Sequence, residues 1–144
     1  RVYVGKFLIT GLGSQTITGL PFRPSQVTFV GYANVESYNL NSDNGVGNNN
    51  NTIANSFGYM KGFARNDNPI ISQQVICGGG NGNSINDISR YASSSHCIGI
   101  RYANQNGDNL GRTSAILTSF NSNGFTINVD SFADGLVILY EAYR

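Results

Sequence analysis

Residues 114–130 read SAILTSFNSNGFTINVD and carry the clearest structural signal in the chain. After the Asn123-Gly124 pair, apolar and polar residues alternate, so Phe125, Ile127 and Val129 share one face of an extended strand. Asn-Gly favours a tight hairpin because both residues tolerate positive φ. The segment therefore predicts an antiparallel hairpin with one buried face and one polar face.

Similar extended runs recur along the whole chain. No window carries apolar residues at i, i+3, i+4 and i+7 over three turns, so no helix is predicted. We expect an all-β domain, an antiparallel β-sandwich of jelly-roll or related type with about nine short strands. The runs cover roughly residues 2–10, 15–19, 26–34, 56–64, 71–77, 96–103, 113–120, 124–130 and 135–143.

Turn signals and polar segments separate these runs. Pro21 and Pro24 exclude a central strand between them. Two long polar segments, 35–55 with its run Asn48–Asn51 and 78–95 with its glycines, are predicted to be functional or mobile loops. Further Asn-Gly pairs predict turns at 44–45, 81–82 and 106–107.

The last predicted strand is apolar on both faces. Leu136, Ile138 and Tyr140 share one face, and the first run, 2–10, has the same two-faced character. Such strands are covered on both sides, so we expect the terminal strands to lie near each other at the centre of a sheet. We also expect the domain to self-associate through one outer sheet, as a homotrimer. The predicted contact residues are Val137, Leu139 and Tyr143.

The composition limits the kinds of partner that the protein is predicted to bind. Charged residues make up 12% of the 144 residues and the net charge is +1, so no basic surface for nucleic acid is predicted. The polarity comes from 20 Asn rather than from charge. The sequence contains no run of 18 apolar residues, so no membrane span is predicted. We interpret residues 1–144 as a single domain, part of a longer polypeptide or of a multi-subunit assembly.

Catalytic motifs are weak. His96 is the only histidine, so a Ser-His-Asp or Cys-His unit would have to use it. Cys97 would point to the opposite face of a strand, and Ser93–Ser95 lack the flanking glycines of a nucleophile elbow. The eight carboxylates reveal no pair of the glycosidase kind. We predict no enzymatic activity, and a polysaccharide-degrading enzyme is the alternative.

Metal and cofactor signals are also weak. Residues 104–108 place side-chain oxygens at alternate positions, as calcium loops do, but Ala115 stands where an EF-hand needs glutamate. A hairpin turn explains the same residues, so no metal is predicted. Gly78–Gly82 is not followed by the Lys of a phosphate loop, and no cofactor is predicted. Cys77 and Cys97 are interpreted as buried free thiols, with a disulfide left open.

Both ends of the chain resemble a known module. Residues 9–27, ITGLGSQTITGLPFRPSQV, resemble the opening of a β-sandwich module found near the C-terminus of phage and prophage tail and surface proteins. Residues 120–129, FNSNGFTINV, resemble its hairpin, and there is a more distant similarity to H-type lectins. The resemblance implies a trimeric virion or cell-surface domain that contacts a host glycan or receptor. Residues 35–112 are not covered by it.

A glycan site would use the polar and aromatic residues of the middle of the chain. Asn amides supply donors and an acceptor at low charge, and Tyr offers a rigid amphipathic ring. The leading hypothesis is therefore a receptor- or glycan-binding module of a phage tail tip or fibre, or of a bacterial surface protein. The alternative is a structural virion module (decoration, baseplate or fibre knob) that serves trimerisation. The candidate ligand-binding residues are Asn83, Asp87, Arg90, Tyr91, His96, Arg101, Tyr102 and Asn104.

Overall fold

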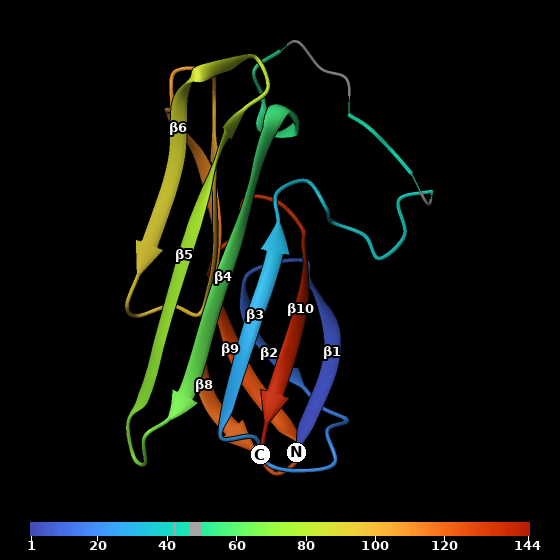
Figure 1. Ribbon diagram of the computed structural model, residues 1–144, viewed down its shortest axis with the longest axis vertical. Coiled ribbons are helices and arrows are strands. Elements are labelled where there is room, and N and C mark those ends of the chain that lie inside the picture. Colours follow the sequence, from blue (N-terminus) through green and yellow to red (C-terminus); the bar gives the residue numbers. More distant parts are fainter. Residues whose placement is uncertain (42, 47–49) are drawn as a thin grey trace.

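The computed structural model is a sandwich of two antiparallel β-sheets (Figure 1). It describes residues 1–41, 43–46 and 50–144. The predicted all-β sandwich is confirmed, and within these residues the one helical element is a 3₁₀ turn, η1 (Ile53–Asn55). In spatial order, the six-stranded sheet contains β1 (Val2–Ile9), β10 (Leu136–Tyr143), β3 (Gln26–Tyr32), β4 (Ser56–Asn66), β5 (Ile71–Asn81) and β6 (Ser84–Ser93). The four-stranded sheet contains β2 (Gly13–Ile17), β9 (Gly124–Ser131), β8 (Asn109–Asn121) and β7 (Ile98–Ala103).

Three of the predicted Asn-Gly turns join neighbouring strands. The hairpin predicted around Asn123-Gly124 connects β8 to β9, with Phe120 opposite Phe125. Its turn residues are Ser122 and Asn123, however, and neither Asn123 nor Gly124 has the predicted positive φ. Gly124 already belongs to β9 and is glycine because a Cβ there would clash with the Ile17 carbonyl oxygen. The pair at 81–82 lies at the turn from β5 to β6, and the pair at 106–107 lies in the turn from β7 to β8. Gly107 has a φ of 79° there, the left-handed conformation that favours glycine.

The core lies between the sheets and is richest in aromatic rings near β1, β10, β3 and β9. Phe7, Phe29, Phe125 and Tyr140 contact one another with ring centroids 5.3 to 6.3 Å apart, mostly edge to face. Each such pair contributes about 0.5–1.5 kcal/mol beyond the area that it buries. Gly5 is required beside this cluster, because a Cβ there would lie 2.4 Å from the hydroxyl of Tyr140.

The prediction of a loop over residues 78–95 is wrong. β5 continues to Asn81 and β6 occupies Ser84–Ser93, so the sandwich has ten strands rather than nine. Among these glycines Gly79 packs tightest against β4: a Cβ there would lie 2.0 Å from the carbonyl oxygen of Phe57. A glycine run thus marks a close approach between β4 and β5 here, not a flexible segment.

The terminal strands pair with each other, as expected, but β1 is not central. β10 lies between β1 and β3, whereas β1 forms one edge of the six-stranded sheet and β6 the other. Both termini lie at one end of the molecule, and the β5–β6 hairpin lies at the other end (Figure 1).

The predicted loop over 35–55 contains no strand in its described residues and ends in η1. Asn48 and Asn49 of the predicted asparagine run lie outside the described residues. None of the described residues belongs to a helix long and apolar enough to span a bilayer.

Candidate functional site

Exposed apolar residues concentrate on the side of the six-stranded sheet that faces away from the four-stranded sheet. We call it the outer face. Alternation along β10 explains it: Leu136, Ile138 and Tyr140 are buried in the core, while Leu139 is 49% exposed on the opposite side. The partly exposed Val137 and Tyr143 share that side with Leu139. All three residues predicted to form the oligomer contact therefore lie on the outer face.

Apolar residues gather on this face from every strand of the sheet. Of the thirteen large exposed hydrophobic residues that the structure describes, eight lie there. Each of these eight side chains is about half to two-thirds exposed. Soluble monomers rarely leave large contiguous apolar patches in contact with water. The eight are Val2, Val4, Tyr32, Phe57, Tyr59, Ile76, Ile88 and Leu139.

The outer face is hollowed beside Lys61 of β4. Three shallow hollows of about 230, 210 and 330 Å³ all border this lysine. The first reaches Leu139 and Glu141, the second reaches Ile76, and the third lies over the bare backbone of Gly78. The tyrosines Tyr32 and Tyr59 border the third hollow, with ring centroids 6.2 Å apart. Apolar side chains of a second molecule can pack into these hollows.

The structure does not bring the eight predicted glycan-binding residues into one site. Tyr102 has no exposed surface and lies in the core, so it cannot contact a ligand from outside. Burial raises the pKa of its hydroxyl, and the charge of Asp134 adds to this effect. Arg90 is exposed on the outer face of β6. The remaining six residues fall into two groups.

The first group lies at the end of the sandwich away from the termini, which we call the loop end. Here the turns 81–84 and 104–108 meet η1, held by a hydrogen bond from Gly82 N–H to the Asn55 carbonyl. Arg101 donates to the Ser89 hydroxyl and to the Gly107 carbonyl, so its guanidinium is already engaged. Asp87 lies next to Gly107. The predicted residues Asn83, Asp87, Arg101 and Asn104 belong to this group.

The side-chain oxygens of the turn at 104–108 accept hydrogen bonds from within the turn. Asn104 Oδ1 accepts from the N–H groups of Asn106 and Asp108, and Asn104 Nδ2 donates to the Asp108 carboxylate. This is the hairpin-turn interpretation of the segment. Among the described residues no group of three or more His, Cys, Asp or Glu could hold a metal ion.

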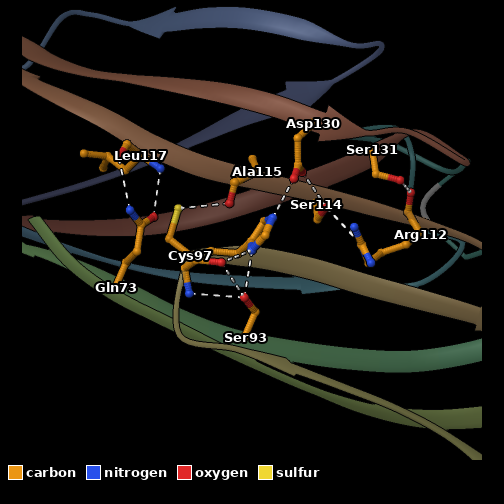
Figure 2. Close-up of polar contacts among 11 residues, drawn as sticks. Gln73, Ser93, Cys97, Arg112, Ser114, Ala115, Leu117, Asp130 and Ser131 are labelled. Atoms are coloured by element: carbon orange, nitrogen blue, oxygen red, sulfur yellow. Dashed lines mark hydrogen bonds and ion pairs between the residues drawn. The ribbon is translucent and has the colours of Figure 1, made fainter.

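The second group contains Tyr91 and His96 and forms a polar cluster where β6 leads into β7. His96 Nε2 lies 2.6 Å from Asp130 Oδ2, and His96 Nδ1 lies 2.7 Å from the Ser93 hydroxyl (Figure 2). Ser114 donates to the other oxygen of Asp130 at 2.6 Å. The chain of contacts thus joins β6, β8 and β9.

Arg112 extends this cluster on β8. Its Nε donates to Ser114, and its guanidinium carbon lies 4.9 Å from the centroid of the Tyr91 ring. Partial burial acts to raise the pKa of Asp130. Hydrogen bonds from Ser114 and His96, with the charges of His96 and Arg112, outweigh it and hold the pKa of that carboxyl below its ordinary value.

The Ser93–His96–Asp130 order is that of a proton relay. With a neutral imidazole protonated on Nε2, His96 donates to Asp130 and accepts from Ser93. In serine hydrolases the two ring nitrogens are used the other way round, with Nδ1 facing the carboxylate and Nε2 facing the serine. Ser93 Oγ also accepts from the Ser95 N–H at 3.2 Å and lies 3.0 Å from the Ser95 hydroxyl. That N–H is therefore not available to stabilise an oxyanion. We interpret the cluster as a latch that fastens the edge strand β6 to the four-stranded sheet.

Both cysteines are free thiols in the structure. Burial raises the pKa of the Cys97 thiol to about 12 and also raises the pKa of Cys77. Cys97 donates weakly to the Ala115 carbonyl at 3.7 Å. Cys97 is buried as predicted, whereas Cys77 is only partly buried. Because their pKa values are raised, both thiols stay protonated at neutral pH.

Sequence reasoning missed the partner of His96 and most of the outer face. Asp130 is 34 residues from His96, and only the pairing of β8 with β9 brings it close. The outer-face residues of β6 were missed because residues 78–95 are predicted to form a loop. Those of β4 and β5 lie in predicted strands, but the sequence does not show which of their faces is exposed. In β6, polar and apolar residues occur on both faces, so alternation offers no clear signal.

Comparisons with known proteins return no relative. No protein-family model matches the chain, and neither a curated protein nor a solved structure shows significant similarity to it. The resemblance to phage tail modules and H-type lectins therefore stays a prediction from the sequence motifs.

Proposed function

We propose that this chain is a non-enzymatic assembly module that associates with copies of itself through the outer face, as a homotrimer. The apolar outer face carries the proposal. Its eight exposed apolar side chains offer area on the order of the ~800 Å² that each partner contributes to a standard protein interface. Covering that area removes it from water at about 25 cal/mol per Å² before the costs of association.

The second candidate function is contact with a host glycan or receptor, made by the assembled copies at the loop end. It is favoured by the exposed or partly exposed polar residues that the structure gathers there, among them Asn83, Asp87 and Asn104. Together with the motif resemblance, this supports a location of the proposed module on a virion or an extracellular surface. In this arrangement the outer face holds the copies together and the loop end points outward.

Leu139→Asp tests the assembly role. An unpaired carboxylate in the contact is costly to desolvate, so we expect the variant to be monomeric while keeping its fold. The matched control is Leu12→Asp, because Leu12 is 71% exposed in the turn between β1 and β2, outside the six-stranded sheet. Light scattering after size exclusion gives the mass, and circular dichroism checks the fold. A Leu139→Asp variant with the native oligomeric mass would show that the outer face is not the contact.

A glycan array probed with the assembled protein tests the second candidate. We expect binding that Asp87→Ala combined with Asn104→Ala removes without changing the mass. If the native assembly binds no glycan and does not adsorb to cells, the loop end has no such role and the assembly role stands alone.

A further inference from the structure

The outer face carries few charges: Lys6 and Glu141 on the β10 side of β3, and Lys61, Arg65 and Arg90 on the β4 side. Glu141 projects from β10, next to Thr28 of β3, whereas Lys61 projects from β4, next to Val30 of β3. Arg90 of β6 adds positive charge on the β4 side. Lys6 of β1 is the one cation on the β10 side, and its ammonium lies 4.4 Å from the centroid of the Tyr38 ring, drawn toward the loop.

Lys61 and Glu141 do not pair within one copy. Two strand spacings separate them, about 10 Å across the sheet. Among the described residues the ion pairs are those of Arg65 with Asp67 and of His96 with Asp130. Glu141 instead accepts a hydrogen bond of 2.7 Å from the Tyr143 hydroxyl. Both charges border the hollow that Val4 and Leu139 also line, so an apolar partner without charges would bury them uncompensated.

We propose that Lys61 of one copy pairs with Glu141 of the next and so sets the register of the self-association, an inference that rests on the proposed function. A three-fold ring with the strands along its axis lays the β10 half of one outer face on the β4 half of the next. This arrangement brings Glu141 of one copy to the side of the next that carries Lys61 and Arg90. Val30, Ile76 and Leu139 surround the pair, exclude water and strengthen it.

The ion pair fixes how the two faces align, which the apolar contacts alone do not. Flat apolar surfaces slide with little change in free energy, whereas a misaligned pair leaves two charges desolvated and unpaired. The commitment to a second copy, rather than to another protein, follows from the match of charges: the face carries both the cation and the anion that its own contact needs.

The experiment is a charge swap followed by sedimentation equilibrium of the full chain. We expect Lys61→Glu and Glu141→Lys each to weaken association at least about tenfold, because each juxtaposes like charges in the contact. The double variant, Lys61→Glu with Glu141→Lys, restores the pair and should return the association constant close to the native value. Asp43→Lys, an equal charge change in the loop before β4, serves as the control and should associate as the native chain does.

Two outcomes overturn the inference in different ways. If Leu139→Asp dissociates the assembly but the double variant associates no better than the single ones, the register is wrong and the proposed function stands. If the native chain is a monomer at every concentration, the proposed function and this inference both fail. Circular dichroism of all variants confirms that the exposed substitutions leave the fold intact.

Discussion

At the scale of single residues, the cluster around His96 shows how one polar chain secures an edge strand. Ser93 belongs to β6, Ser114 to β8 and Asp130 to β9, and His96 connects the first to the last. Asp130 accepts a hydrogen bond at each carboxylate oxygen, one from His96 and one from Ser114. The same groups would be needed for serine chemistry, but the Ser93 oxygen is already saturated by its neighbours.

Asp130→Asn should destabilise the fold by about 1 kcal/mol at neutral pH, because the charge-assisted bonds from His96 and Ser114 are lost. The fold lowers the pKa of Asp130, so the carboxylate's stabilisation is fully present above the unfolded pKa, about 3.9, and is lost as pH falls through the lower folded pKa. The difference in free energy of unfolding between native chain and variant should therefore vanish in strong acid. Urea titrations across pH measure it.

Asp43→Asn is the control for that series, since Asp43 is an exposed loop residue. A serine-reactive fluorophosphonate should leave Ser93 unlabelled, as a latch requires. Labelling that depends on His96 would instead assign the cluster to catalysis.

At the scale of elements, the two sheets approach closely where the chain that leads from β6 to β7 crosses β4. A Cβ on Gly62 would lie 1.8 Å from the carbonyl oxygen of Cys97. The opposite case is Gly78 of β5, where a Cβ would meet nothing within 4 Å. Two glycines in neighbouring strands therefore have different reasons to be glycine.

Gly62→Ala should lower the free energy of unfolding by about 1–3 kcal/mol or more, because backbone must move to admit the methyl group. Gly78→Ala should change it little, or raise it slightly by restricting the unfolded chain. Chemical denaturation of both variants measures the contrast. Equal stability of the two would mean that the sheets do not approach at Gly62 as the structure shows.

Some elements of the fold can be predicted from the sequence and others cannot. The hairpin over 114–130 was predictable because alternation and a turn signal coincide there. β6 was not, because the glycines at its start and the serines at its end favour a loop by local propensity. Tertiary packing decides instead: Tyr91 covers Gly99 of β7, where a Cβ would lie 2.5 Å from the ring. The cluster around His96 was likewise beyond local reasoning, since it combines three segments of the chain that are far apart in sequence.

At the scale of the whole molecule, the two sheets bury one face each, but their outer faces differ. The outer face of the six-stranded sheet carries eight of the thirteen exposed large hydrophobic residues that the structure describes. The sequence indicated this asymmetry through the two-faced terminal strands, and the structure extends it to β4, β5 and β6. A sheet that leaves so much apolar area in water lowers its free energy by association.

Sedimentation equilibrium of the unaltered chain tests this account most directly. The protomer mass is 15.5 kDa. The account predicts a mass close to three times that value at high concentration, falling toward one protomer on dilution. A mass of 15.5 kDa that does not change with concentration would contradict it.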